Sequence, residues 1–161
     1  MEKVGLSYEK FKDESPFELS GGQKRRVAIA SILAMKPQYL ILDEPTAGLD
    51  PEGRDEILKE IKNIYDSEDD MTVIIVSHSM EDIAKVADRV IVMNQGKVFA
   101  DDRPEIIYSM GEELDQIGLD VPQITRATKL LEAKGYKFSK TITTVEEAYK
   151  ELIAQLGDKH E

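Results

Sequence analysis

Two short apolar runs, separated by a helical pattern, constrain the fold of this chain most strongly. The first is Tyr39–Leu42, which ends at Asp43 and Glu44, and the second is Thr72–Val76, which leads to His78. Short uninterrupted apolar runs of this kind predict strands that are buried on both faces of a sheet. Both predicted strands deliver polar side chains at their carboxyl ends.

The residues between the two runs predict a helix. Asp50 is a favourable N-cap and Pro51 suits the first helical position. The apolar residues that follow share one face at helical spacing: Ile57, Leu58, Ile61, Ile64 and Tyr65. A strand, a helix and a strand in succession predict an α/β fold, with a parallel sheet and flanking helices.

The rest of the chain divides into two kinds of pattern. A helix is expected from Gly21 to about Met35, and residues 90–99 read as a strand, a turn and a second strand. From residue 102 the pattern predicts short helices. The last helix should begin at Thr144 and carry an apolar stripe: Val145, Ala148, Tyr149, Leu152, Ile153 and Leu156. The predicted domains are therefore 1–101 and a helical annex, 102–161.

Charge and composition exclude several functions. The 161 residues include 21 Lys and Arg against 32 Asp and Glu, which gives a net charge of −11. Non-specific nucleic-acid binding depends on clustered cations, so this acidity argues against it. Cysteine is absent, which excludes disulfides and thiolate metal sites.

Leu19–Gln23 is the first segment whose residues suggest a site. Two glycines lead directly into a helix, so backbone N–H groups and the helix dipole favour a phosphate there. Taken alone, the segment could also be an ordinary glycine-rich loop before a helix.

The carboxyl ends of the two predicted strands carry the second candidate site. Asp43 could hold Mg²⁺ through water, and Glu44 could orient a water for attack on a phosphoryl group. His78 could donate a hydrogen bond to phosphate. Each has an alternative reading, as an exposed acidic turn or as a structural histidine.

In combination these motifs resemble the nucleotide-binding subunits of ATP-binding-cassette (ABC) proteins. Leu19–Gln23 resembles the signature, Leu40–Glu44 the Walker B strand, Ala47–Asp50 the D-loop and His78 the switch histidine. Their order and separations are those of the family, over about residues 15–100. The resemblance implies part of a P-loop NTPase sheet with flanking helices.

A narrower resemblance is to the ATPase subunits of energy-coupling-factor (ECF) importers, which take up vitamins, cobalt or nickel. It rests on Leu19–Ala30, Asp43–Pro51 and Ala87–Met93, with Leu119–Pro122 and Thr143–Glu147 in the annex. It implies a peripheral subunit on the cytoplasmic face of the membrane. The implied partners are a second ABC ATPase subunit, identical or different, a transmembrane coupling protein and a membrane component that binds the substrate. Nucleic acid is not among them.

The resemblance also assigns roles, with ATP and Mg²⁺ as cofactors. Asp43 would help hold Mg²⁺ through water, Glu44 would be the general base, and His78 would contact the γ-phosphate. Asp50 would link two sites across a dimer. Four signature residues would contact nucleotide held by the opposite subunit: Ser20, Gly21, Gly22 and Gln23. The neighbouring cations Lys24–Arg26 are expected at a solvated helix start near that interface.

One motif of the family is missing, because no G-x-x-x-x-G-K-[ST] stretch occurs in the sequence. The chain is therefore expected to be the C-terminal part of a longer ATPase. We expect it to hydrolyse ATP negligibly alone, since the candidate catalytic residues lack a nucleotide in cis. We also expect residues 72–77 to pair directly with 90–93, or a second chain to fill the gap by exchange.

The sequence thus predicts an ATP-hydrolysing subunit of an ECF-type importer that takes up a metal ion or vitamin. Two alternatives remain: a fragment of a non-transport ABC ATPase, and a non-enzymatic fragment that dimerises or regulates. A further expectation concerns the last helix, where Leu152, Ile153 and Leu156 should pack against the annex or against a second subunit.

Overall fold

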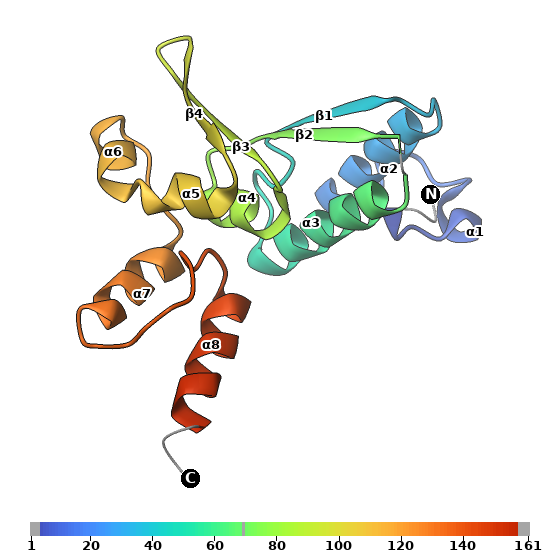
Figure 1. The fold of residues 1–161 in the computed structure, drawn as a ribbon. Coiled ribbons are helices and arrows are strands. Elements are labelled where there is room, and N and C mark those ends of the chain that lie inside the picture. The colour runs from blue at the N-terminus through green and yellow to red at the C-terminus, as the bar shows by residue number, and fades with distance from the viewer. Residues whose placement is uncertain (1–3, 69, 158–161) are drawn as a thin grey trace. The chain divides into compact units, whose positions relative to one another are not determined.

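The computed structural model describes residues 4–68 and 70–157, and it forms two compact units (Figure 1). The first unit is Met1–His78 and the second is Ser79–Glu161. This division reflects how the chain packs. The predicted boundary after residue 101 separates motif-bearing residues from the annex and stays a prediction.

The first unit is built on a two-stranded parallel sheet, as the sequence predicts. Strand β1, Tyr39–Asp43, pairs in parallel with β2, Thr72–Val76, in a register that places Asp43 opposite Val76. Helices α2, Gly21–Leu33, and α3, Pro51–Asp66, lie on the same face of this sheet (Figure 1). A short helix α1, Tyr8–Phe11, precedes them.

A buried apolar cluster lies between the sheet and these helices. It is drawn from β1, from α2 and α3, from the residue before β2 and from the start of the chain: Val4, Leu6, Ile29, Leu40, Leu42, Ile57, Ile61, Ile64 and Met71. Val73 and Ile75 of β2 pack against it partly buried. Alternate strand residues point into this cluster, so Leu40 and Leu42 are buried while their neighbours are not.

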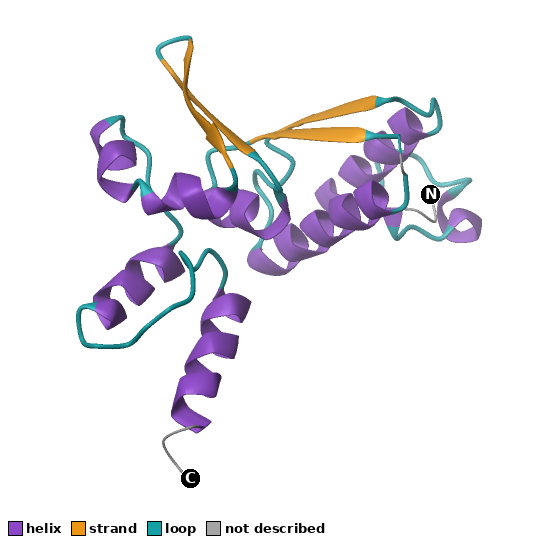
Figure 2. Cartoon of the chain, in the orientation of Figure 1, coloured by secondary structure: helices purple, strands orange, loops and turns teal. Residues whose placement is uncertain are grey.

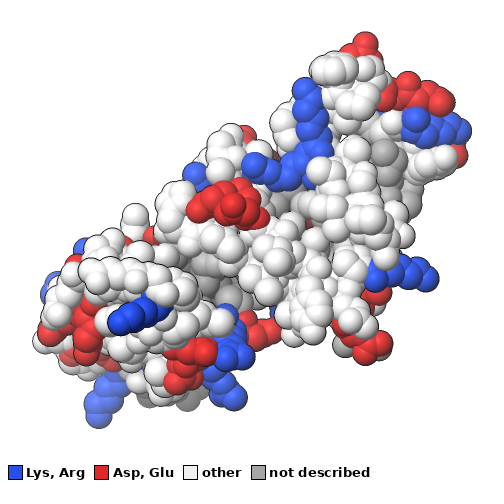
Figure 3. Space-filling view, turned by 90° about the horizontal axis from the view of Figure 1, so that it is seen from above, with Lys and Arg blue, Asp and Glu red and all other residues white. Residues whose placement is uncertain are grey.

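The prediction that both strands are buried on two faces is wrong. On the face away from the helices, Tyr39 is 68% exposed, Ile41 63%, Ile74 44% and Val76 51%. The reason is that α2 and α3 cover one face only. In Figure 3, which views the molecule from above, the surface over the sheet carries few charged side chains. Parallel sheets are ordinarily covered on both faces, so this face is unusual.

Side-chain caps fix where the two helices of this unit begin. Ser20 Oγ accepts the N–H of Gln23 at 3.2 Å, and Gln23 Oε1 accepts the N–H of Ser20 at 2.8 Å, which completes a capping box on α2. The carboxylate of Asp50 accepts the N–H of Gly53 at 2.9 Å on α3. The predicted start of α3 is thereby confirmed.

The second unit consists of one antiparallel hairpin and short helices, as predicted (Figure 2). Gln95 and Gly96 join its strands, with φ of 49° and 74°, which is the backbone of a type I′ turn. In chain order the elements are α4 Met80–Val86, β3 Val90–Asn94, β4 Lys97–Asp102, α5 Pro104–Ser109, α6 Gly111–Gln116, α7 Gln123–Glu132 and α8 Val145–Gly157.

The core of the second unit surrounds Tyr108, whose ring is fully buried. The Tyr108 hydroxyl donates to the carbonyl of Met80 at 3.2 Å. Burial, with the nearby Glu81 carboxylate, raises the pKa of Tyr108 well above its usual range. At the start of α8, Thr144 and Glu147 exchange hydrogen bonds of 3.3 Å, which confirms the predicted cap.

Two further expectations are corrected. Residues 72–77 do not pair with 90–93: in the described residues β2 pairs with β1, and β3 with β4, in separate sheets. Exchange with a second chain stays a prediction. On α8, Leu152 is partly buried, whereas Ile153 is 51% and Leu156 43% exposed, so these last two are not packed against the annex. Packing against a second subunit stays a prediction. Among the described helices, none is long and apolar enough to cross a bilayer.

Candidate nucleotide site

The carboxyl ends of β1 and β2 bring Glu44 and His78 together. The N–H of Glu44 donates to the carbonyl of Val76 at 2.8 Å, which continues the sheet ladder one residue beyond β1. His78 lies two residues beyond Val76, and its backbone N–H donates to Glu44 Oε1 at 3.2 Å. The ring nitrogen His78 Nδ1 is 2.8 Å from the same oxygen. Parallel register therefore places a carboxylate and an imidazole in direct contact.

The backbone at Glu44 is left-handed, with φ of 47°. Such a conformation costs a non-glycine residue about 1–2 kcal/mol, and it often marks a functional site. It turns the chain sharply out of β1 into the loop Pro45–Ala47. In that loop the N–H of Ala47 donates to the carbonyl of Glu44 at 3.1 Å.

Both members of the pair remain accessible to a reactant. The side chain of Glu44 is 34% exposed and that of His78 is 84% exposed. The carboxylate can accept a proton from water, and the exposed imidazole can donate a hydrogen bond to an anion. With Glu44 ionised, Nδ1 carries the proton that faces the carboxylate, so Nε2 can donate a hydrogen bond to an anion only when the ring is doubly protonated.

Asp43 precedes this pair at the exposed end of β1. Within 4–68 and 70–157, no three His, Cys, Asp or Glu side chains gather into a metal-holding group. Mg²⁺ commonly keeps several waters and takes one or two carboxylates together with phosphate oxygens. A single accessible carboxylate beside Glu44 fits that mode of binding, and it does not fit an all-protein cage.

The signature residues form a separate group at the start of α2. Ser20 and Gln23 satisfy one another in the capping box, so their side chains are ordered. A Cβ built on Gly21 or on Gly22 would meet nothing within 4 Å. The two glycines therefore leave space for a ligand beside the positive end of the helix dipole, although the N–H of Gln23 is already bonded to Ser20 Oγ. This end of α2 can receive an anion.

Asp50 has a structural role in this chain, as the N-cap of α3. The D-loop that precedes it contains Gly48, whose φ of 74° is left-handed. A link from Asp50 to a second site across a dimer stays a prediction.

Two arginines that follow the signature were misjudged by sequence reasoning, which expected a solvated helix start. Arg26 is only 17% exposed, and it forms ion pairs with Glu56 and Glu60 of α3. Arg25 donates to backbone carbonyls of the loop Pro45–Ala47. Of the three cations only Lys24 is exposed as expected. No local spacing could have revealed these contacts, because the partners lie 20 or more residues away.

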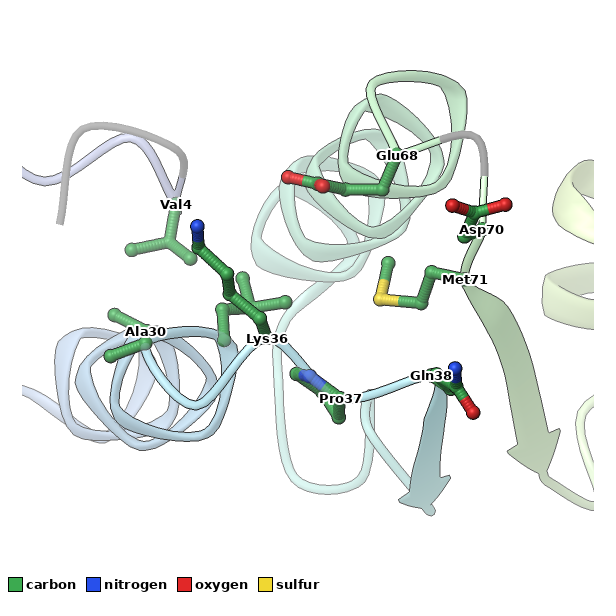
Figure 4. Close-up of a pocket in the computed structure, with 10 residues that line it drawn as sticks. Val4, Ala30, Lys36, Pro37, Gln38, Glu68, Asp70 and Met71 are labelled. Atoms are coloured by element: carbon green, nitrogen blue, oxygen red, sulfur yellow. The ribbon is translucent and has the colours of Figure 1, made fainter.

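A pocket of about 520 Å³ lies at the opposite end of the sheet (Figure 4). It opens where Gln38 leads into β1 and Met71 leads into β2. Its charged lining is Lys36, Glu68 and Asp70. Two carboxylates beside one ammonium group do not favour a phosphate, so this pocket is no part of the candidate nucleotide site.

Comparison with known proteins finds relatives among ABC transporter proteins. The family model described as ABC transporter matches residues 1–47. The energy-coupling factor transporter ATP-binding protein EcfA2 of Clostridium tetani is 55% identical over 159 residues, which are 99% of this chain and 55% of that protein. EcfA2 of Bacillus subtilis is 48% identical over 155 residues, 96% of this chain and 55% of that protein.

The chain is homologous to ECF transporter ATP-binding proteins of the ABC ATPase family. It spans about half the length of the curated relatives it matches. Two kinds of solved structure support the fold. One is cbiO1 from Clostridium perfringens, part of the ABC transporter complex cbiONQ, with a TM-score of 0.62 and 38% identity over 81% of this chain and 50% of that chain.

The second solved structure is the dimeric structure of MJ0796, a bacterial ABC transporter cassette. Its TM-score is 0.53, with 33% identity over 64% of this chain and 43% of that chain. A post-hydrolysis state of MJ0796 holds ADP and Pi. The predicted α/β fold of the ABC ATPase type is thus confirmed.

Proposed function

We propose that this chain provides the signature, Walker B, D-loop and switch elements of an ATP-hydrolysing cassette in an ECF-type importer. The cassette would couple ATP hydrolysis to the uptake of a metal ion or vitamin. The observation that carries the proposal is the contact between Glu44 and His78 at the carboxyl end of a parallel sheet. Ligands of open α/β sheets bind at that end.

Each residue of the pair has a distinct task in this proposal. In a cassette that holds nucleotide beside it, Glu44 would accept a proton from the attacking water, since its carboxylate is accessible and held by two hydrogen bonds from His78. His78 would donate from Nε2 to the γ-phosphate as the doubly protonated ring, because Nδ1 faces Glu44. Asp43 would hold Mg²⁺ through water. The metal, when bound, supplies positive charge that offsets the charge of the phosphates.

The signature would act on the nucleotide of another subunit. At this end of α2, Gly21 and Gly22 leave space for a ligand, and Ser20 and Gln23 are ordered by their capping box. The partner in this proposal is a second ABC ATPase subunit, with Asp50 at the interface. The annex, 102–161, would add contacts between subunits through the exposed stripe on α8. A transmembrane coupling protein would hold the assembly at the cytoplasmic face of the membrane.

The test uses the purified chain with and without a partner subunit. The partner is full-length EcfA2 of Clostridium tetani with its own signature serine replaced, so that it depends on a signature from outside. We expect negligible ATP hydrolysis from either protein alone and measurable turnover from the mixture. Ser20→Arg in this chain should abolish that turnover, and Glu44→Gln should leave it, because the working site uses the partner's own base.

Two outcomes would contradict the proposal. One is vigorous ATP hydrolysis by the chain alone that is lost in Glu44→Gln. It would show that the chain needs no partner subunit to hold the nucleotide. Assembly of the mixture without any turnover would favour the non-enzymatic alternative, a dimerisation module.

A further inference from the structure

Arg25 connects the signature helix to the loop that follows Glu44. Its Nη1 donates to the carbonyl of Pro45 at 2.5 Å and to the carbonyl of Ala47 at 3.1 Å. Its neighbours have other contacts: Lys24 reaches the carbonyl of Phe17 at 3.5 Å, and Arg26 pairs with two carboxylates of α3. Arg25 is therefore the member of this cationic run that binds the loop.

The loop needs such a donor. Pro45 is buried, and a buried carbonyl without a partner carries a large desolvation cost, whereas Ala47 is exposed. Hydrogen bonds from a guanidinium are charge-assisted and strong. Because Arg25 Nη1 donates to the carbonyls of both Pro45 and Ala47, it also fixes the direction of the loop. That direction matters because the backbone is left-handed on both sides of the loop, at Glu44 and at Gly48.

Glu44 is consequently held from two sides. From one side, β2 binds its backbone N–H, and His78 binds its carboxylate. From the other side, Arg25 holds the two carbonyls directly downstream. Arg25 lies two residues after Gln23 on one rigid helix, which is about 3 Å along the axis. Any displacement of the signature end therefore moves the guanidinium as well.

We propose that Arg25 is a positioning residue that sets the orientation of Glu44 and transmits the ligand state of the signature end to it. The contact itself rests on the structure alone. Its catalytic meaning rests on the proposed function. In this scheme, an anion bound at Gly21 and Gly22 shifts α2, and Arg25 carries the shift through the loop to the Glu44–His78 pair.

The first experiment tests positioning in the 161-residue chain by NMR. Arg25→Gln should raise amide hydrogen exchange at Ala47 about tenfold, because the loop loses a charge-assisted anchor. It should also move the ¹⁵N resonance of His78 Nδ1. Arg25→Lys should produce an intermediate change, since one ammonium group cannot reproduce the guanidinium geometry. The matched control is Lys24→Gln, the exposed neighbour, which should leave both readouts as in the wild type.

Two results would overturn positioning. One is exchange at Ala47 in Arg25→Gln that equals the value in Lys24→Gln. The other is a uniform rise in exchange along α2, which would show that Arg25 merely stabilises the helix.

The second experiment tests transmission. The labelled chain is mixed with the signature-deficient EcfA2 partner and a non-hydrolysable ATP analogue. We expect the His78 Nδ1 resonance to move on assembly in the wild type, and to stay in place in Arg25→Gln although assembly persists. Equal movement in both would refute transmission through Arg25. If no assembly forms with the wild type, the proposed function fails, and the first experiment alone decides the role of Arg25.

Discussion

Replacing Arg26 by methionine should destabilise the first unit in a way that depends on pH. Arg26 pairs with Glu56, and its Nε lies 3.2 Å from Glu60 Oε2. These contacts join α2 to α3. Methionine keeps much of the apolar stem and removes the charge, so the variant isolates the electrostatic contribution from the packing contribution.

The size of the effect follows from how far the groups are buried. Side chains of Arg26 and Glu60 are 17% and 16% exposed, whereas Glu56 is 56% exposed. Breaking a fully buried pair costs about 3–5 kcal/mol, and an exposed pair contributes about 0–1 kcal/mol. The burial of this cluster lies between those two cases. Arg26→Met should therefore lower the free energy of unfolding by about 2 kcal/mol near neutral pH.

The pH dependence has a definite sign. Burial raises the pKa of Glu60, the Arg26 charge lowers it, and the Glu56 charge raises it, with a net increase above 4.5. A raised pKa means that Glu60 favours the folded state in acid and that this contribution is lost as pH rises through the folded pKa. Removing Arg26 raises that pKa further. The difference between variant and wild type should therefore be small near pH 4.5 and should grow toward neutral pH.

Urea unfolding at pH 4.5, 6.0 and 7.5 measures this difference, followed through amide resonances of α3. The matched control compares Arg26→Met with its parent in a Glu60→Gln background. There the pH dependence of the difference should shrink, because the amide does not titrate and only the exposed Glu56 remains as a partner of Arg26. A difference that is the same at all three pH values in the wild-type background would refute the electrostatic reasoning. So would an equally large pH dependence in the Glu60→Gln background.

Three further predictions concern other contacts. Asp50→Ala should lower the free energy of unfolding by about 1 kcal/mol, because α3 loses its N-cap, whereas Asp50→Asn should retain most of it in urea unfolding. Tyr108→Phe should lower the free energy of unfolding by about 1 kcal/mol in thermal unfolding, because a buried hydrogen bond is lost. The control is Tyr149→Phe, at a 65% exposed position, which should cause no measurable change. Burial alone would raise the pKa of Glu147, but hydrogen bonds, above all the one from Lys140, lower it overall. Glu147→Gln should therefore lower the free energy of unfolding at pH 7, and the two proteins should become equally stable as pH falls through the lowered pKa. A stability difference that is independent of pH would contradict this.

Features that depend on neighbouring residues were predictable from the sequence. The start of α3 follows from Asp50 and Pro51, and the capping box on α8 follows from the spacing of Thr144 and Glu147. Parallel pairing of the two apolar runs follows from the helix between them. The positions of Glu44 and His78 at the strand ends follow from the same pattern, although their hydrogen bond required the register.

Features that depend on which layers are present were not predictable. The uninterrupted apolar run that contains Ile41 indicates burial on both faces, yet in this chain helices cover one face. The expected pairing of 72–77 with 90–93 was also wrong, since β2 pairs with β1 and β3 with β4, and no local pattern in the sequence identifies those partners. Arg25 and Arg26 were misjudged because their acceptors are distant in sequence, and charge alone does not distinguish a solvated cation from a bridging one.

The uncovered face of the β1–β2 sheet changes how the stability of this chain responds to temperature. The heat capacity of unfolding grows with the apolar area that unfolding newly exposes to water. Tyr39, Ile41, Ile74 and Val76 are already between 44% and 68% exposed in the folded chain, so they add little to that area. The heat-capacity increment should therefore fall below the usual value of about 12–15 cal/mol/K per residue. A smaller increment flattens the curve of unfolding free energy against temperature. Cooling should therefore lower the stability of this chain less than that of a domain of equal length whose sheet is covered on both faces.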